Sequence, residues 1–337
     1  MFSKVFVEKD ITSHPRTLSI LSKLSKPNVT YIDKVEDVFG RVYKPYLQKR
    51  SELNLFIGEK KGQLIKPAPA AYGLSGSPHY YFIHAYNCVY ECQYCYLQGY
   101  FNSPDIVLFV NHEDICREIT ELCQSKHASE KEVWFHAGEF SDSLALSGLT
   151  EEWPLYWDTF ASLPNAFLEL RTKSHNIRSI VDLNPLPNVV VSFSLAPEPA
   201  TKEFDLKTPP LAARLKAIKK LSDKGHTIGL HLDPVVYDDK YLEKYEQLID
   251  QIMSVTSDSR IKYVSLGVVR FTKKVYQCVQ KNYPESSLHA GEFVSSFDDK
   301  VRYPRPMRLQ ILKNLQALVV SKGTAREKVY LCMEDLN

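Results

Sequence analysis

The sequence has no long apolar segment and no strong excess of charge. No run of about 18 apolar residues, the length that a membrane-spanning helix needs, occurs among its 337 residues. Residues 1–5 do not resemble the apolar core of a signal peptide. The formal net charge of +2 does not by itself indicate nucleic-acid binding, although a local basic face would not show in the total. We therefore expect a cytoplasmic protein without membrane attachment.

The sequence also lacks the evenly paired cysteines of a disulfide framework. It contains seven cysteines, an odd number, and three of them, Cys88, Cys92 and Cys95, fall within eight residues. This crowding fits a reducing compartment better than an oxidising one. Cys116 and Cys123 stand seven residues apart in a helical pattern, and we expect them to be core residues.

Strand-like and helical segments alternate through most of the chain, and 44% of its residues are hydrophobic. Such alternation with short connections indicates a parallel sheet or a barrel. We predict an α/β fold, a partial (β/α)6 barrel over residues 76–271. An N-terminal α/β extension is expected over 1–75, and a C-terminal helical extension with a final strand over 272–337. The expected barrel strands span residues 80–86, 131–137, 167–172, 189–195, 227–236 and 261–269.

Polar residues follow these expected strands. In barrels of this kind the chemistry lies at the carboxyl ends of the strands. No single polar residue at a strand end is informative, but several together opposite the cysteine segment predict a common pocket. The residues at these ends are Ser141, Asp142, Lys173, Ser174, His175, Ser194, His231, Asp233 and Arg270.

The three crowded cysteines form the pattern C-x3-C-x2-C after the first expected barrel strand. Thiolates are preferred ligands of iron–sulfur clusters and of zinc. Both sites usually take four protein ligands, and only three are local here, as in a reactive centre with an open position. A zinc site completed by Cys116, Cys123 or a histidine is one alternative. Thiol redox chemistry is another, although it leaves Cys88 without a role.

The cysteine segment resembles the signature of the radical S-adenosylmethionine superfamily, which usually places an aromatic residue, here Tyr94, before the last cysteine. The resemblance implies a radical-SAM-type partial barrel and a 4Fe–4S cluster held by Cys88, Cys92 and Cys95. The remaining iron would bind S-adenosylmethionine, whose reductive cleavage gives a 5′-deoxyadenosyl radical that abstracts a hydrogen atom. An electron donor such as flavodoxin or ferredoxin is implied as a partner.

A closer resemblance is to the spore photoproduct lyase family. Residues 87–98 are similar to the cluster loop of that family, and residues 135–142 fall where the lyases carry the motif F-x-A-x-C-x-S-D. The resemblance implies that Ser141, Lys173 and Ser194, together with Tyr94, bind S-adenosylmethionine. Lys173 would pair with its carboxylate.

Glu139 occupies the position of the cysteine in that motif, which in the lyases donates a hydrogen atom to the substrate radical. A carboxylate does not donate a hydrogen atom readily. Either the substrate differs, or another group quenches the radical. Tyr96, which matches a tyrosine proposed to relay hydrogen in the lyases, and Cys332, in the last expected strand, are candidates. Glu139 could instead bind a substrate amine, act as a general acid or base, or hold the cluster loop.

The leading hypothesis is therefore a lyase-like radical enzyme that acts on DNA or on a nucleotide-like substrate. A basic stretch over residues 44–66 adds weak support for nucleic acid as a partner. One alternative keeps the radical chemistry but modifies a peptide or a small metabolite. Another is a non-catalytic iron–sulfur protein that senses redox state or S-adenosylmethionine. Neither the substrate nor the oligomeric state follows from the sequence.

Overall fold

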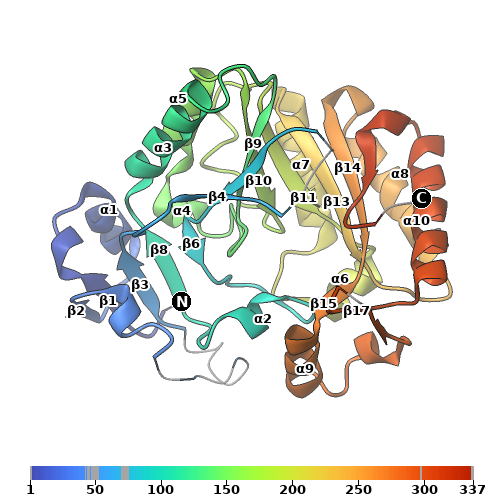
Figure 1. The fold of residues 1–337 in the computed structure, drawn as a ribbon, viewed down its shortest axis with the longest axis horizontal. Helices are drawn as coiled ribbons and strands as arrows, with labels where there is room; N and C mark the ends of the chain where they lie inside the picture. The colour runs from blue at the N-terminus through green and yellow to red at the C-terminus, as the bar shows by residue number, and fades with distance from the viewer. Residues whose placement is uncertain are drawn as a thin grey trace.

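The computed structural model describes residues 2–41, 43, 46, 53–69, 76–296 and 298–334. Its centre is an eight-stranded sheet in the order β18–β14–β13–β11–β10–β9–β5–β4 (Figure 1). Six neighbouring strands run parallel and form the predicted partial barrel. They are β5 (His79–Phe82), β9 (Val133–Ala137), β10 (Ala166–Thr172), β11 (Val189–Ser194), β13 (Thr227–Val235) and β14 (Ile261–Val268).

Two further strands extend the sheet. β18 (Val329–Leu331) pairs parallel with β14, so the expected last strand joins the barrel sheet as a seventh parallel strand. At the opposite edge, β4 (Ile65–Pro67) pairs antiparallel with β5. Helices cover the outer face of the sheet in Figure 1. These are α3 (His112–Gln124), α5 (Trp153–Ala161), α7 (Leu211–Lys224), α8 (Tyr241–Val255) and α10 (Arg305–Ser321).

Side chains alternate along the barrel strands between an apolar outer layer and a polar interior. In β10, Leu168 and Leu170 pack in the main hydrophobic core beneath the helices. Glu169, between them, is equally buried but bonds to side chains from neighbouring strands. Successive residues of a strand point to opposite faces, so apolar residues fix the outer layer while polar ones fill the barrel.

A second sheet of five strands lies beside the barrel, at the left of Figure 1. Its order is β2 (Val29–Ile32), β1 (Val5–Glu8), β3 (Leu55–Gly58), β8 (Ile106–Phe109) and β6 (Ala85–Tyr86), and α1 (Pro15–Lys23) belongs to the same region. β6 and β8 come from beyond residue 75, so the second sheet uses strands from both predicted segments. The boundary itself remains a prediction, because residues 70–75 lie outside the described residues.

One local prediction was wrong. The apolar run 80–86 does not form one strand, because the chain leaves β5 at Phe82 and enters the second sheet at Ala85. The backbone carbonyl of His84, at this crossing, accepts a hydrogen bond of 3.2 Å from the Phe109 amide of β8. Pro154 lies in the first turn of α5, where a missing amide hydrogen costs nothing.

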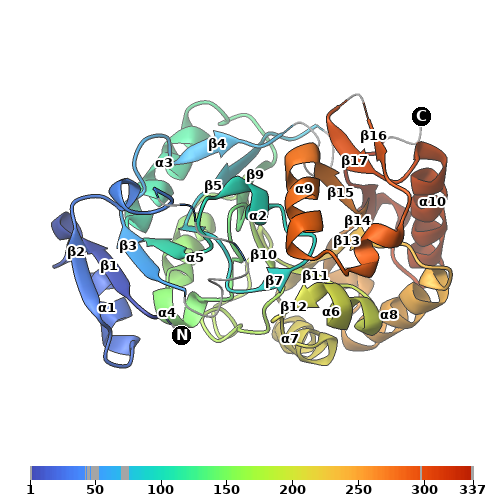
Figure 2. The ribbon, with the colours of Figure 1, turned by 90° about the horizontal axis from the view of Figure 1, so that it is seen from below.

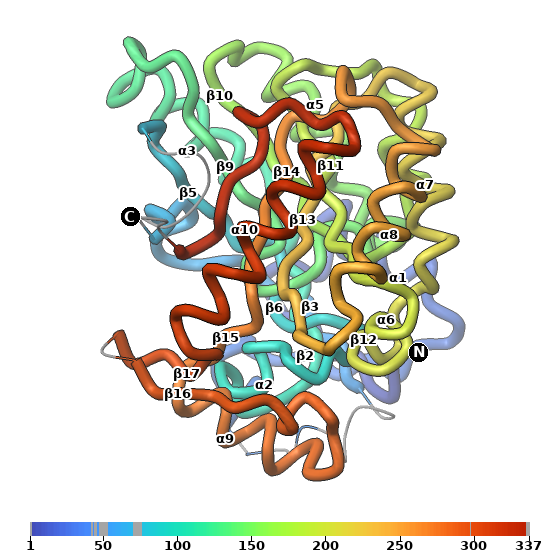
Figure 3. The backbone as a smooth tube through the Cα atoms, turned by 90° about the vertical axis from the view of Figure 1, so that its right-hand side faces the viewer, coloured from blue at the N-terminus to red at the C-terminus, as the bar shows by residue number. Residues whose placement is uncertain are grey.

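The shorter elements gather at the carboxyl ends of the barrel strands. Figures 2 and 3 show α2 (Leu97–Tyr100) and α9 (Lys273–Asn282) together at this end. The side chains of Gln98 and Asn282 join these helices by a hydrogen bond of 2.8 Å. The remaining elements are β7 (Glu91–Cys92), α4 (Ser147–Thr150), α6 (Glu198–Phe204), β12 (Asp205–Leu206), β15 (Arg270–Thr272), β16 (Val294–Ser295) and β17 (Lys300–Arg302). Within the described ranges, no helix is both long and apolar enough to cross a membrane.

Candidate functional site

A cavity of about 800 Å³ opens at the carboxyl ends of the barrel strands. Cys88, Cys92 and Cys95 all line it, on the loop that follows β5 and β6. The wall opposite is built by residues that end β9, β10, β11, β13 and β14. The predicted residues that line this cavity are Tyr94, Tyr96, Glu139, Ser141, Asp142, Lys173, Ser194, Asp233 and Arg270.

The cysteine loop is held by side chains on both of its flanks. Before it, Asn87 adopts the left-handed conformation (φ 63°) and donates two hydrogen bonds, to the carbonyls of Ser103 (2.8 Å) and Asp105 (2.7 Å). After it, the amide of Gln98 donates to the carbonyls of Gln93 (2.8 Å) and Cys95 (2.9 Å). Side-chain hydrogen bonds therefore hold the cysteine loop on both flanks.

The donor set fits an iron–sulfur cluster. None of the seven cysteines forms a disulfide, and the three in the loop line one cavity. Burial, followed by the nearby Asp205 carboxylate, raises the pKa of Cys92 well above its usual range. Among the described residues, no three histidine, cysteine or carboxylate side chains converge on a single ion position. A 4Fe–4S cluster makes no such demand, because each thiolate binds a different iron.

The distant ligands considered for a zinc site do not reach this cavity. Cys116 and Cys123, on α3, are buried in the main hydrophobic core, as expected from their spacing. Among the described residues that line the cavity, none is a histidine. The thiols in the cavity are therefore the three of the loop.

Lys173 lies at the end of β10 beside the cysteine loop. Its Nζ donates to the hydroxyl of Tyr94 (2.7 Å) and pairs with Asp205 (3.1 Å). Asp205 is buried, is hydrogen-bonded by the Tyr94 hydroxyl and pairs with the fully buried Arg214 at 3.1 Å. Burial opposes ionisation of Asp205, but Lys173 and Arg214 outweigh it and hold the pKa of the carboxyl below its usual range.

Sequence reasoning missed Asp205 and Arg214. Asp205 belongs to β12, whose two residues pair antiparallel with β7, so that Asp205 faces Cys92. A strand of two residues leaves no periodic pattern in the sequence. The carboxylate therefore anchors the cysteine loop through its backbone pairing and through the side chains of Tyr94 and Lys173.

Asp142 connects the ends of β9 and β10. One carboxylate oxygen accepts from the hydroxyl of Thr172 (2.6 Å) and from the amides of Leu144 (3.0 Å) and Ala145 (2.9 Å). The other oxygen accepts from the amide of Lys173 at 2.7 Å. Asp142 thus lines the cavity and fixes the backbone from which Lys173 extends.

Glu139 follows Gly138, whose positive φ of 84° favours glycine. A Cβ at position 138 would lie 2.6 Å from the Ser143 hydroxyl, so the close approach of the two segments also requires glycine. Tyr96 lines the same cavity and is 41% exposed at its opening. Glu139 and Tyr96 thus face one space, as their predicted roles require.

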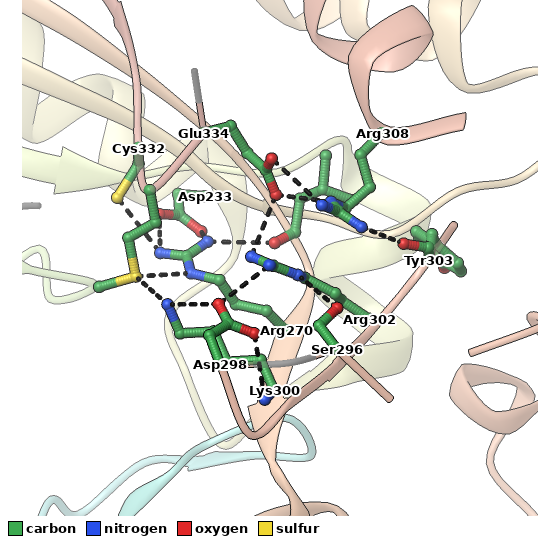
Figure 4. A network of polar contacts seen from close by, with 12 residues as sticks. Asp233, Arg270, Ser296, Asp298, Lys300, Arg302, Tyr303, Arg308, Cys332 and Glu334 are labelled. Carbon is green, nitrogen blue, oxygen red and sulfur yellow. Dashed lines mark hydrogen bonds and ion pairs between the residues drawn. The ribbon is translucent and has the colours of Figure 1, made fainter. Parts of the chain in front are cut away.

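Cys332 lies outside the described lining of the cavity, although it follows β18 at the mouth of the barrel. Its Sγ lies 3.2 Å from Nη2 of Arg270, which pairs with Asp233 at 2.9 Å (Figure 4). Burial, followed by the Asp233 carboxylate, raises the pKa of Cys332 to about 11. The next residue, Met333, does line the cavity.

His231 does not line the cavity, contrary to the prediction. Its Nε2 lies within the barrel, 2.8 Å from Glu169 and 3.1 Å from the Tyr263 hydroxyl. Ser192 and His136 contact the same carboxylate. Burial opposes ionisation of Glu169, but nearby Arg171 and the histidines lower its pKa well below the usual range. These polar side chains form a buried hydrogen-bonded group around Glu169.

Comparison with known proteins identifies the family. A family model described as spore photoproduct lyase matches residues 25–303. The chain is 26% identical to the spore photoproduct lyase of Bacillus subtilis (strain 168) over 64% of each chain. It is 24% identical to that of Geobacillus sp. (strain Y412MC61), over 62% of this chain and 61% of the relative. The alignment therefore spans less than two thirds of the length of these curated relatives.

The solved structures extend the likeness to the whole fold. A spore photoproduct lyase mutant with bound AdoMet and dinucleoside spore photoproduct superimposes with a TM-score of 0.84. The superposition covers 99% of both chains at 18% sequence identity. This likeness confirms the predicted radical-SAM-type partial barrel. With the family model covering most of its length, the chain belongs to the spore photoproduct lyase family of radical S-adenosylmethionine proteins.

Proposed function

We propose that this protein is a radical S-adenosylmethionine enzyme that acts on a pyrimidine lesion in nucleic acid, as its family does. One observation carries the proposal: the three loop cysteines and the cofactor residues Ser141, Lys173 and Ser194 line a single cavity. The family model and the curated relatives support the same reaction class.

In this proposal Cys88, Cys92 and Cys95 hold a 4Fe–4S cluster, and S-adenosylmethionine lies against the ends of β9, β10 and β11. When bound, the cluster and S-adenosylmethionine supply a 5′-deoxyadenosyl radical that removes a hydrogen atom from the substrate. The ammonium group of Lys173 would pair with the methionine carboxylate of S-adenosylmethionine and, at the same time, with Asp205. Tyr94 is hydrogen-bonded to both Lys173 and Asp205 and so holds the cysteine loop beside the lysine side chain.

The charge of the cavity supports an anionic substrate. Its lining carries five cationic side chains, those of Arg171, Lys173, Arg270, Lys274 and Lys300, and three carboxylates. A phosphodiester would be attracted to this surface, as nucleic-acid backbones are to clustered lysine and arginine. Of the basic stretch 44–66, Lys44, Lys49 and Arg50 lie outside the described residues, so its role stays a prediction.

A hydrogen atom must return to the substrate radical at the end of the reaction. We assign this step to Tyr96, whose O–H bond would break as the substrate C–H bond forms, leaving a tyrosyl radical. Cys332 is the second candidate, because its thiol lies next to Arg270 at the cavity rim. Glu139 then acts on the substrate through hydrogen bonds or proton transfer rather than as a hydrogen-atom donor.

The test is an anaerobic repair assay. Protein reconstituted with iron and sulfide is mixed with dithionite, S-adenosylmethionine and a synthetic dinucleoside spore photoproduct. We expect 5′-deoxyadenosine and the repaired thymine dinucleoside, and neither from the Cys92→Ala variant. Formation of 5′-deoxyadenosine without repair would overturn the substrate assignment and favour a peptide or a small metabolite. An intact cluster without cleavage would instead favour the non-catalytic sensor.

A further inference from the structure

Three side chains form a line from the cavity wall into the protein. Ser141 lines the cavity after β9, and its Oγ lies 3.0 Å from Nε2 of His84, in the crossing between β5 and β6. On the other side of the ring, Nδ1 of His84 lies 3.4 Å from Oε1 of Glu152, which precedes α5. His84 is 5% exposed and Glu152 is 1% exposed. Ser141 connects this buried pair to the cavity.

The contacts of Glu152 fix the position of the hydrogen atoms along this line. Burial opposes ionisation of Glu152, but its contacts with His84, then His112 and Thr150, hold the pKa of the carboxyl below its usual range. An ionised carboxylate only accepts hydrogen bonds, so the nitrogen that faces it, Nδ1 of His84, carries a hydrogen. In a neutral imidazole, the other nitrogen then has a lone pair and accepts.

The hydroxyl of Ser141 must therefore donate to Nε2 of His84. Once its single hydrogen is used in this way, Ser141 presents only oxygen lone pairs to the cavity. A serine without such a partner would turn its hydroxyl toward either a donor or an acceptor. A ligand acceptor, such as a carboxylate oxygen, would compete with Nε2 of His84 for the single hydroxyl hydrogen of Ser141.

We propose that Glu152 and His84 are positioning residues that fix Ser141 as a hydrogen-bond acceptor, so that the ligand atom it contacts must be a donor. The inference rests on the proposed function, in which the ligand is S-adenosylmethionine. Its donor groups are the two ribose hydroxyls, the α-ammonium and the 6-amino group of adenine. The carboxylate of S-adenosylmethionine only accepts hydrogen bonds, so it cannot bind an accepting Ser141. It pairs instead with Lys173, whose ammonium only donates. The Glu152–His84 pair therefore sets the orientation in which the cofactor binds.

The first test observes the tautomer directly and needs no cofactor. The full chain is labelled with ¹⁵N-histidine, and the signals of His84 are identified by their loss in His84→Gln. We expect a protonated Nδ1 and an unprotonated Nε2 for His84 above neutral pH. A protonated Nε2 would overturn the proposal whatever the enzyme does. Should His84→Gln fail to fold, the shift of one histidine in Ser141→Ala makes the same assignment.

The second test measures which ligand group Ser141 contacts. Equilibrium binding of S-adenosylmethionine to the reconstituted protein is compared with analogues that lack the 2′-hydroxyl, the 3′-hydroxyl, the α-amino group or the 6-amino group of adenine. We expect one analogue to bind about five- to tenfold more weakly, as for one lost hydrogen bond. That preference should disappear in Ser141→Ala and shrink in His84→Gln, because the serine hydroxyl is then free to rotate.

His127→Gln is the matched control. His127 is also a buried histidine, but its Nε2 lies 2.7 Å from the hydroxyl of Tyr80. We expect it to keep the wild-type preference among the analogues, and equal loss of preference in both histidine variants would overturn the proposal. If S-adenosylmethionine binds with the same preferences in wild type and Ser141→Ala, this inference fails alone. If wild type does not bind S-adenosylmethionine, the proposed function fails with it.

Discussion

The three loop cysteines differ in their surroundings although they face one cavity. Cys92 is buried and sits in β7, whereas Cys88 and Cys95 are half-buried. The Sγ of Cys88 already accepts a hydrogen bond of 3.4 Å from the amide of Tyr90. Such a hydrogen bond also stabilises a thiolate, which is the form that binds iron. The three thiols therefore differ in burial and in hydrogen bonding, although they line one cavity.

Replacing any one of the three by alanine should prevent cluster assembly, because a site with two thiolates leaves two irons without a protein ligand. We expect bound iron and sulfide to fall to background after anaerobic reconstitution of Cys88→Ala, Cys92→Ala or Cys95→Ala. Cys278→Ala serves as the matched control, since Cys278 lies on α9 and is a free, half-buried thiol. A full cluster spectrum in any of the three loop variants would contradict the ligand assignment.

His112 makes the stability of the protein sensitive to acid. It is buried at the start of α3, and burial lowers its pKa from 6.5 to about 4. Between these values the unfolded chain binds the proton and the folded protein does not. The free energy of unfolding therefore falls as the pH falls through this range.

Urea denaturation of wild type and His112→Gln at pH 7 and pH 5 measures this contribution. Wild type should lose about 2 kcal/mol more than the variant between the two pH values. The glutamine keeps a polar group beside the hydroxyl of Tyr156 but does not titrate. Equal losses in the two proteins would show that His112 is not the acid-sensitive group.

At the scale of elements, two short strands hold the cysteine loop on the barrel. β7 and β12 pair antiparallel, and Asp205 of β12 also receives the ammonium of Lys173 and the guanidinium of Arg214. Removing the charge of Asp205 leaves Arg214, which is fully buried, without its anion. Breaking one partner of a buried ion pair in this way is strongly destabilising.

We expect Asp205→Asn to lower the free energy of unfolding by roughly 3 kcal/mol, as measured by urea denaturation. Asp223→Asn is the matched control, because Asp223 pairs with Lys219 on the exposed face of α7 and should matter little. A small and equal effect of both substitutions would mean that the loop does not depend on the buried anion.

The last described residues after β18 form a second anchor at the cavity rim. Glu334 accepts hydrogen bonds from Nε of Arg308 (2.5 Å) and Nη1 of Arg302 (3.3 Å), both largely buried (Figure 4). These contacts tie the end of β18 to α10 and β17. Met333, between Cys332 and Glu334, is thereby kept in the cavity wall.

Glu334→Gln should cost about 2 kcal/mol of stability, because two buried guanidinium groups then share a neutral partner. Urea denaturation of this variant beside Glu327→Gln provides the comparison. Glu327 is exposed in the short 3-10 helix before β18, so its replacement should change little. Unchanged stability of Glu334→Gln would show that the end of the chain is not anchored as described.

At the scale of the whole molecule, the sequence predicted what depends on local pattern. All six barrel strands were located, because each is a buried run that alternates with an amphipathic helix. Ser141, Lys173 and Ser194 were expected to share a pocket because parallel strands bring their carboxyl ends to one edge, and all three line the cavity. The sequence could not predict the split of 80–86 into β5 and β6, since an apolar run does not reveal which sheet each half joins.

Contacts between segments that are far apart in the sequence were also not predicted. Asp205 reaches Lys173 through the pairing of β7 with β12, and Glu152 reaches His84 because α5 starts behind the cysteine loop. Neither carboxylate belongs to a motif, and each follows only from the assembled barrel. His231 was misplaced for a related reason, since its height in the barrel depends on how far β13 extends beyond it.

The most direct test of the central claim is the transfer of label from the substrate to 5′-deoxyadenosine. A dinucleoside spore photoproduct deuterated at the carbon that loses hydrogen is given to the reconstituted, reduced protein with unlabelled S-adenosylmethionine. We expect deuterium in the 5′-deoxyadenosine that forms with the wild-type protein, and no labelled 5′-deoxyadenosine with Cys92→Ala. Repair without any label in 5′-deoxyadenosine, or an intact cluster that never yields 5′-deoxyadenosine, would contradict the central claim.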